Sequence, residues 1–236
     1  MTTTVALQQD LDTFYELLEI QREKIGGYRY LSSCSGEGSW PQRGIYSFFE
    51  PGEYRKGGKT LRVVRVGTHA VSRGSKTTLW NRLMQHRGHT YGGGNHRGSV
   101  FRLLVGTALI GRGSYHGPAN QSWARGNSAP KEIRVQEKDL ESSVSAHIGK
   151  MPFLWVELDD TPGPESQRAY IERNAIALLS NIMGCPDIPS QFWLGRYCLR
   201  PDIRESGLWN SNHVRERYDP RFLTKLRSLI EPKEII

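Results

Sequence analysis

Apolar residues recur along this chain with spacings that predict several amphipathic helices. In residues 5–24 they return every three or four positions, which places them largely on one side of a helix. Residues 165–183 repeat this spacing and give the clearest helical pattern of the chain. Shorter helices are predicted for residues 77–86, which begin with threonines able to cap a first turn, and for residues 220–230. Each helix has an apolar side that needs a partner, so a shared core is expected.

Three shorter apolar runs fit strands better than helices. Residues 44–49, 61–66 and 151–158 are short, contain β-branched or aromatic residues, and are flanked by Gly or Pro. The first two are close enough to form an antiparallel pair with an elaborated hairpin loop. Residues 100–110 fit a strand or a helix, and residues 111–130 are predicted to form a long loop. Strands interleaved with helices indicate an α+β or α/β layered fold.

The composition shows that the chain is basic. The 236 residues include 32 Lys and Arg against 24 Asp and Glu, which gives a net charge of +8 and a pI near 9.5. Basic residues dominate between Arg82 and Arg134, with Gly, His and aromatic residues interleaved. With 37% hydrophobic residues, the chain can build one domain with elaborations. A basic surface of this kind favours a nucleic acid as the partner.

The cysteines, the N-terminal residues and the lengths of the apolar stretches predict a cytoplasmic protein. The three cysteines are Cys34, Cys185 and Cys198, and their odd number and spacing indicate neither a disulfide framework nor a zinc site. Reduced thiols are therefore expected. The first residues lack the basic start and apolar run of a signal peptide. No apolar stretch approaches the ~18 residues of a membrane span, so no membrane partner is expected.

Three ionisable side chains stand out by their positions on the predicted helices. Glu172 lies within the apolar sector of the clearest helix, where a carboxylate is costly unless it is paired, hydrogen-bonded or bound to a cation. The ordinary alternative is an ion pair with Arg168, one turn earlier. Arg82 and His86 are four residues apart, so they share one helix face beside an apolar stripe. A solvated basic face is the alternative for this pair.

Two tripeptides on the predicted strands connect these candidates. Gly44-Ile45-Tyr46 begins the first strand and Arg65-Val66-Gly67 ends the second, and Arg82, His86 and Glu172 follow in that order. Together these pieces resemble the GIY-YIG nuclease family, and in style its restriction-endonuclease-like members. The resemblance implies a metal-dependent endonuclease that hydrolyses phosphodiester bonds, and a restriction, defence or mobile-element setting.

The resemblance also assigns roles to residues. Tyr46 would orient or deprotonate the attacking water, and Glu172 would hold one Mg²⁺ or Mn²⁺ ion. Arg82, with His86, would offset the charge that develops on the phosphate. Asn181 is the candidate for an asparagine that follows the glutamate of the family, and Asn210 is its competitor.

The second motif departs from the family pattern, because this chain has Arg65 where the family has tyrosine. Either Arg65 takes over a charge-stabilising role, or Tyr54 or His69 fills the space. We leave these alternatives open at this point.

The family analogy also predicts the organisation of the chain. The α+β fold would be a small mixed sheet with a central three-stranded antiparallel core, flanked by helices and carrying loop insertions. Residues 1–42 would form an N-terminal helix and linker, and residues 43–183 the nuclease core. Residues 88–143 would be a basic insertion in that core, and residues 184–236 a C-terminal extension packed on it.

The basic insertion and its surroundings are predicted to bind DNA, in double-stranded form, and the chain could act as a homodimer. The candidate contacts combine positive charge with aromatic and imidazole groups; they are Arg87, His96, Arg97, Arg102, Arg112, Trp123 and Arg125. Two rival functions stay open: a catalytically decayed DNA-binding protein on the same scaffold, and a basic RNA-binding or ribonuclease domain.

Overall fold

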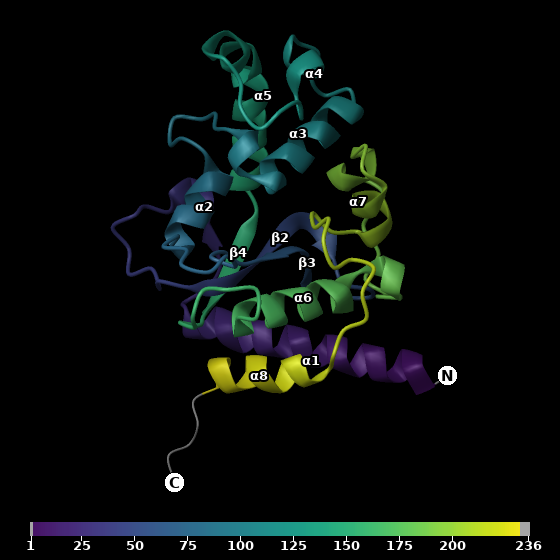
Figure 1. Ribbon diagram of the computed structural model, residues 1–236. Helices are drawn as coiled ribbons and strands as arrows, with labels where there is room; N and C mark the ends of the chain where they lie inside the picture. Colours follow the sequence, from purple (N-terminus) through teal and green to yellow (C-terminus); the bar gives the residue numbers. More distant parts are fainter. Residues whose placement is uncertain (1, 232–236) are drawn as a thin grey trace.

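A four-stranded antiparallel sheet lies at the centre of the protein in a computed structural model, which describes residues 2–231 (Figure 1). Its strands are β1 (Arg29–Tyr30), β2 (Gly44–Tyr54), β3 (Leu61–Gly67) and β4 (Pro152–Glu157). Their order is β1-β4-β2-β3, and every neighbouring pair is antiparallel. The predicted α+β fold with a three-stranded antiparallel centre is confirmed, since β4, β2 and β3 are the three expected strands.

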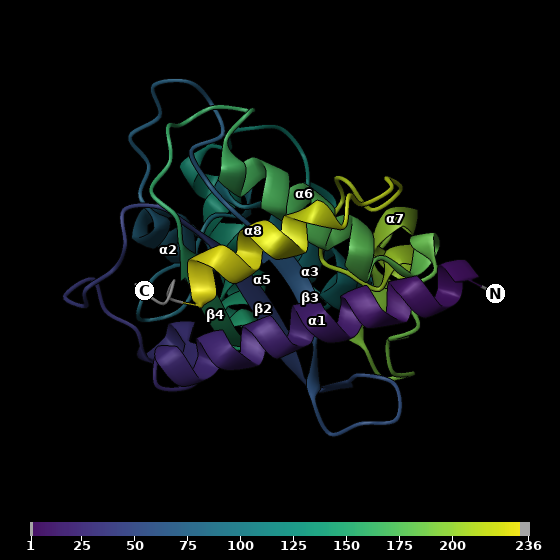
Figure 2. The ribbon, with the colours of Figure 1, turned by 90° about the horizontal axis from the view of Figure 1, so that it is seen from below.

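Helices cover both faces of this sheet. They are α1 (Thr2–Lys24), α2 (Leu79–Arg87), α3 (Val100–Gly111), α4 (Ala119–Ser122), α5 (Lys131–Gly149), α6 (Gln167–Leu179), α7 (Pro201–Ser206) and α8 (Arg221–Ile230). In Figure 1, α3, α4 and α5 lie above the sheet, and α6, α1 and α8 lie below it. Figure 2 shows α1 and α8 side by side on the lower side, so the two ends of the chain share one layer.

Alternation along β2 divides the apolar side chains between two cores. Ile45 and Phe49 pack with α1, α6 and α8 on one face of the sheet. Tyr46 and Phe48 point to the other face, where α2, α3 and α5 supply the partners. Successive strand residues therefore send Tyr46 toward α2, the helix that carries the candidate arginine and histidine.

The chain that follows α7 covers the free edge of β3. The backbone N–H of Trp209 donates to the carbonyl of Val64 at 2.7 Å. The side chain of Asn210 accepts from the backbone N–H of Val66 and donates to its carbonyl, at 3.1 and 2.8 Å. An edge strand exposes such groups to unwanted pairing, and the tail satisfies them here. It also brings residues 210–213 to the end of β3.

The structure decides one open alternative in the middle of the chain and shows which helices the predicted insertion contains. Residues 100–110, which fitted either a strand or a helix, form helix α3, capped by the Ser99 hydroxyl. Residues 88–143, predicted to be a basic insertion, contain α3, α4 and most of α5, and α5 continues to Gly149. Leu140, Val144 and Ile148 of α5 are buried against α3 and the sheet, so this segment is part of the core.

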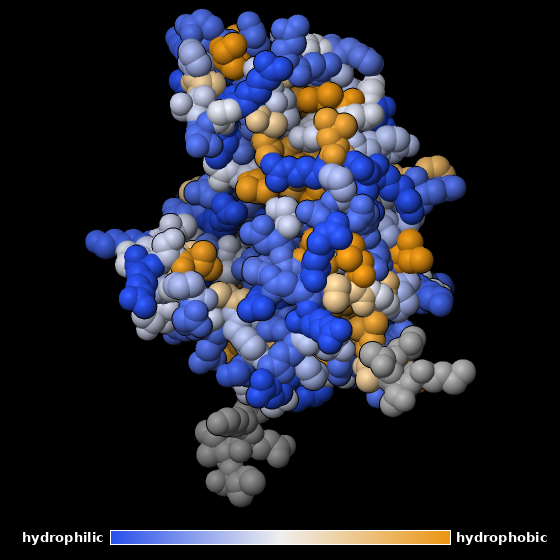
Figure 3. Space-filling view, turned by 45° about the vertical axis from the view of Figure 1, so that its right-hand side comes forward, coloured by the Kyte–Doolittle hydropathy of each residue, from blue (hydrophilic) through white to orange (hydrophobic). Residues whose placement is uncertain are grey.

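The surface agrees with the composition. The face in Figure 3 is mostly hydrophilic, and the apolar residues on it form small separate groups. Among residues 2–231, no helix is both long enough and apolar enough to cross a bilayer.

Candidate active site

A cleft of about 720 Å³ opens where β3 ends. Its walls come from β3, α2, the first turns of α6 and the tail that follows α7. The side chains in it that carry charge or hydrogen-bonding groups include Arg65, Thr68, Arg82, Glu172, Asn210 and His213. The structure therefore brings three of the predicted site residues, Arg65, Arg82 and Glu172, to one cavity.

Glu172 is half-buried in the wall that α6 contributes. Its Oε1 accepts the backbone N–H of Thr68 at 3.0 Å, which ties the helix to the end of β3. Burial raises the pKa of Glu172, and the nearby Arg65 guanidinium and the Thr68 N–H oppose that rise. The alternative ion pair with Arg168 is not formed, because Arg168 binds Asp160 and the carbonyl of His69 instead.

This carboxylate fits the requirements of a single hard cation. Its Oε2 has no hydrogen-bond partner among the described residues, and it lies in an open cleft. Within residues 2–231, no group of three or more His, Cys, Asp or Glu side chains is arranged to hold a metal. Mg²⁺ commonly takes only one or two protein carboxylates and fills its other positions with water and substrate phosphate. Glu172 can supply that one ligand.

Tyr46 lies directly behind the cleft wall and is 1% exposed. Its phenol oxygen is 2.8 Å from Nε2 of His86, which is itself fully buried. The ring rests on Gly67, its partner across the β2–β3 pair. A side chain at Gly67 would overlap the phenol, because an added Cβ would lie 2.3 Å from Oη. Close packing against the Tyr46 ring therefore explains Gly67, the glycine of the second motif.

Arg65 occupies the place of the second motif tyrosine and separates Tyr46 from the cleft. Its guanidinium donates to the carbonyl of Trp209 and lies 4.8 Å from the ring centroid of Phe101. Its Nε is buried and has no partner among the described residues. Burial lowers the pKa of Arg65, while the neighbouring Tyr46 and Glu172 favour its charged form. Arginine remains a cation under such conditions, so a fixed positive charge stands between phenol and carboxylate.

The two other residues considered for this place lie elsewhere. Tyr54 pairs with Leu61 at the opposite end of the β2–β3 pair and is 49% exposed. His69 is buried beside the cleft, with Nε2 3.3 Å from the carbonyl of Gln42. Burial lowers the pKa of His69 to about 4, so its imidazole is neutral at neutral pH. Neither side chain lines the cleft.

Arg82 and His86 share one face of α2, but only Arg82 reaches the cleft. Arg82 is half-buried in the cleft wall, where it donates to Gln85 Oε1 at 2.8 Å. His86 points inward to Tyr46 and does not reach the cleft. Burial lowers the pKa of His86 well below its usual value, and the positive charges of Arg82, Arg65 and Arg102 lower it further. His86 is therefore a neutral hydrogen-bonding group.

The structure favours Asn210 over Asn181 as the asparagine of the site. The Asn181 amide donates to the carbonyls of Cys185 and Asp187, and the residue is outside the cleft lining. The physical reason is that α6 ends at Leu179, and the following turn directs Asn181 toward its own C-terminal neighbours. Asn210 lines the cleft while it holds the β3 edge.

His213 is a cleft residue for which the sequence pattern predicted no role in the site. His213 lines the cleft, adopts the left-handed backbone conformation with φ of 65°, and has Nδ1 2.8 Å from Glu216 Oε1. A positive φ at a non-glycine residue is uncommon and requires support from its surroundings. The polar run from Asn210 to His213 was the available signal, but it does not reveal that the tail returns to β3.

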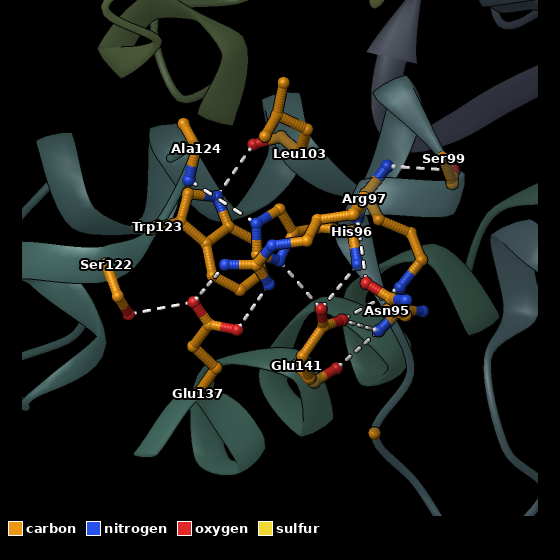
Figure 4. A network of polar contacts seen from close by, with 12 residues as sticks. Asn95, His96, Arg97, Ser99, Leu103, Ser122, Trp123, Ala124, Glu137 and Glu141 are labelled. Atoms are coloured by element: carbon orange, nitrogen blue, oxygen red, sulfur yellow. Dashed lines mark hydrogen bonds and ion pairs between the residues drawn. The ribbon is translucent and has the colours of Figure 1, made fainter. Parts of the chain in front are cut away.

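Most of the predicted DNA contacts of the basic segment lie inside the fold, as Figure 4 shows. His96 is buried, with Nδ1 3.0 Å from Glu141, and stacks on Trp123 with ring centroids 3.8 Å apart. Arg97 makes a bidentate contact with Glu137 at 2.6 and 2.8 Å. Carboxylates on α5 thus satisfy these groups.

Arg102 completes this network and is fully buried. It donates from Nε to Glu141 Oε2 at 3.0 Å and from Nη1 to the carbonyl of His86, also at 3.0 Å. The expectation that His96, Arg97, Arg102 and Trp123 contact DNA is therefore corrected, because burial and internal partners leave their polar groups unavailable.

The remaining three candidates are at least partly accessible. Arg87 is half-buried, donates to the carbonyl of Cys34 at 2.7 Å and lies over the ring of Trp80. Arg112 and Arg125 are exposed on the α3–α5 side of the molecule. These two keep their charge available to a polyanion.

Comparison with known proteins agrees with this geometry. A family model described as the GIY-YIG domain matches residues 5–235, nearly the whole chain. The matched range includes α1 and the tail as well as the strands and helices that carry the motifs. Neither a curated protein nor a solved structure matches the chain.

Proposed function

Because the chain belongs to the GIY-YIG family, a family of nucleases, we propose that the cleft at the end of β3 hydrolyses phosphodiester bonds of DNA with one divalent metal ion. The observation that carries the proposal is the convergence of Glu172, Arg65 and Arg82 on one cavity, with Tyr46 directly behind it. A carboxylate and two guanidinium groups are the complement of a metal-bound phosphate.

Glu172 is the residue that would hold the ion, as Mg²⁺ or Mn²⁺. When bound, the ion supplies Lewis-acid stabilisation of charge on the phosphate oxygens. The raised pKa of Glu172 fits this role, because a cation beside a half-buried carboxylate restores the charged form that burial disfavours. The Thr68 N–H keeps the carboxylate oriented toward the cleft.

Arg82 and Arg65 bind and orient the phosphate. Both guanidinium groups reach the cavity, and fixed positive charge placed where negative charge develops lowers the barrier of phosphoryl transfer. Arg65 also covers Tyr46, so we expect a bound phosphate to draw its guanidinium outward and to give water access to the phenol. Tyr46 then releases its own hydroxyl proton to solvent, orients the attacking water and accepts a proton from it.

Duplex DNA in a restriction or defence setting is the substrate that we favour. The net charge of +8 and the exposed Arg112 and Arg125 suit a polyanion. The family match extends over residues 5–235, and we therefore expect the groups that recognise DNA within this span to belong to the nuclease fold itself. We place this activity in the cytoplasm.

Digestion of supercoiled plasmid tests the proposal. Wild type should nick or linearise the plasmid with Mg²⁺ and should be inactive in EDTA. Glu172→Gln keeps the size of the side chain and should abolish cleavage, whereas Glu132→Gln, an exposed change on α5, should leave it intact.

Two outcomes separate the rival functions. Metal-independent DNA binding with no cleavage at any Mg²⁺ or Mn²⁺ concentration would favour a decayed DNA-binding protein. Faster cleavage of RNA than of DNA with the same sequence would favour a ribonuclease. Either result would replace the proposal.

A further inference from the structure

The cleft at the end of β3 is larger than the part that the proposed reaction uses. The groups assigned to the scissile phosphate and its metal, Arg65, Arg82 and Glu172, line this cleft. Arg173 of α6 and Lys225 of α8 line it as well. A cavity of about 720 Å³ is of the size that holds a whole drug-sized ligand. It therefore has room for more of a DNA strand than one phosphate.

The side chains of α6 show that the cleft passes around this helix. Tyr170 and Glu172 are two positions apart, so they point to nearly opposite sides of the helix, yet both line the cleft. Ala169 and Arg173 lie on the face between them and line it too. On the Tyr170 side, α8 packs on α6 (Figure 2), and Nζ of Lys225 lies 5.8 Å from the centroid of the Tyr170 ring. The cleft therefore extends from Glu172 across α6 to Lys225.

This path across α6 is long enough for more than one phosphate. An α-helix with its side chains is about 10–12 Å across. Successive phosphates of one strand advance ~3.4 Å along duplex DNA. A strand that has its scissile phosphate at Glu172 and crosses α6 therefore brings a neighbouring phosphate to Arg173 and Lys225.

The basic groups at the far end of this path are accessible. Lys225 is exposed, and its ammonium lies over an aromatic ring and makes no ion pair with a described carboxylate. Arg173 pairs with Glu216, but the Arg173 side chain is 58% exposed, and Glu216 also binds His213. Such a surface ion pair contributes little to stability, so the Arg173 guanidinium can turn to a phosphate. Glu165, the second carboxylate of the lining, is exposed and precedes the first residue of α6.

We propose that Lys225 and Arg173 form a second phosphate subsite, which binds a phosphate that neighbours the scissile one in the same DNA strand. The inference rests on the proposed function, because that function places the scissile phosphate beside Glu172. An ammonium and a guanidinium recognise the charge and the oxygen atoms of a phosphodiester, and they read no base. The subsite therefore serves DNA of any sequence and makes α8 part of the DNA-binding surface.

Titration of a fluorescent DNA duplex at several salt concentrations tests the subsite. EDTA is present, so that binding is measured without cleavage. Lys225→Ala and Arg173→Ala should each weaken binding about 3- to 10-fold and flatten the salt dependence by up to ~0.9, which corresponds to the loss of one phosphate contact. Both side chains are exposed, so the thermal unfolding of each variant should match that of the wild type.

Two control variants separate phosphate binding from other effects of the substitutions. Arg227→Ala removes the same charge from the same helix, but Arg227 pairs with Glu231 and does not line the cleft, so its salt slope should equal that of the wild type. If the Lys225 and Arg173 variants keep the slope of the Arg227 variant, the proposal is overturned. Lys225→Arg keeps the charge and should retain the wild-type slope. A slope lowered as far as in Lys225→Ala would indicate lost packing on Tyr170 and contradict the assignment.

Neutral linkages in the DNA locate the bound phosphate. Plasmid digestion supplies a cleavage site, and methylphosphonates are then placed one at a time beside this site in the cleaved strand. At one position the wild type should lose as much affinity as Lys225→Ala loses on unmodified DNA, and Lys225→Ala should lose nothing further. Additive losses at every position would contradict the proposal.

The subsite and the proposed function can fail separately. A wild type that cleaves nothing, but whose binding depends on Lys225 and Arg173 as described, overturns the proposed hydrolysis and leaves α8 as a phosphate-binding surface. A wild type that cleaves DNA with Mg²⁺, and whose Lys225 variant has an unchanged salt slope, overturns the subsite alone.

Discussion

Gly67 offers a quantitative test of how closely the two motifs are packed. Its Cα faces the ring of Tyr46, and a Cβ added there would lie 2.3 Å from Oη, 2.4 Å from Cζ and 2.6 Å from Cε2. Ordinary carbon contacts begin near ~3.5 Å, so the phenol would have to move by about 1 Å. Tyr46 is enclosed and cannot swing away freely. Gly67→Ala should therefore cost about 1–3 kcal/mol of stability, the usual range for overpacking.

For a chain of this length, that cost corresponds to a fall in Tm of ~2–12 °C. Cleavage should fall further, by ~10²-fold, because a 1 Å displacement breaks the contact between Tyr46 and His86. Thermal and urea unfolding measure the first effect, and plasmid nicking measures the second. Gly58→Ala is the matched control, since its nearest neighbours would be 3.7 and 3.9 Å away.

A double-mutant cycle isolates the contact between Gly67 and the Tyr46 ring. In a Tyr46→Ala background the ring is gone, so Gly67→Ala should cost almost nothing, and the difference gives the coupling energy. If Gly67→Ala were as stable as wild type and fully active, the close packing of the two motifs would be refuted.

Three further predictions concern charged residues. Burial raises the pKa of Glu172, so the ionised carboxylate destabilises the metal-free fold, and stability should decline as pH rises above the unfolded value of ~4.3. Glu172→Gln should therefore raise Tm at neutral pH in EDTA, with a gain that disappears in acid; an equal gain at all pH values would contradict the assignment. Arg102→Ala should destabilise the fold by ~3–5 kcal/mol, because it leaves the buried Glu141 carboxylate without its guanidinium partner. Arg125→Ala should instead flatten the salt dependence of duplex binding by up to ~0.9, with stability unchanged; unfolding curves and DNA titrations at several salt concentrations decide both.

The local elements of the site could be predicted because each has a local signal. The strands that carry Tyr46 and Arg65 are bounded by Gly and Pro, and the spacing of Arg82 and His86 follows from helix geometry. Glu172 was recognisable because a carboxylate within an apolar sector requires a partner. The structure adds the partner, the N–H of Thr68, which lies 104 residues away in sequence.

The burial of Arg97 and Arg102 could not be predicted, because their carboxylate partners have no local signal in the sequence. Glu137 and Glu141 lie in a polar stretch of the sequence, and nothing in their local sequence indicates that they meet Arg97 and Arg102. Those pairs join residues 40 and 39 positions apart, so they depend on the packing of α3 against α5. Local charge patterning reports the sign of a segment, but long-range contacts decide whether its charges reach solvent.

The location of the metal ion tests the central claim most directly. Tyr46→Phe removes the proton acceptor and should allow a complex with duplex DNA and Mn²⁺ to be crystallised without cleavage. The anomalous signal of manganese should show one ion in the cleft, about 2 Å from a carboxylate oxygen of Glu172, with Arg82 on the adjacent phosphate. An ion bound elsewhere, or DNA bound away from the end of β3, would contradict the account.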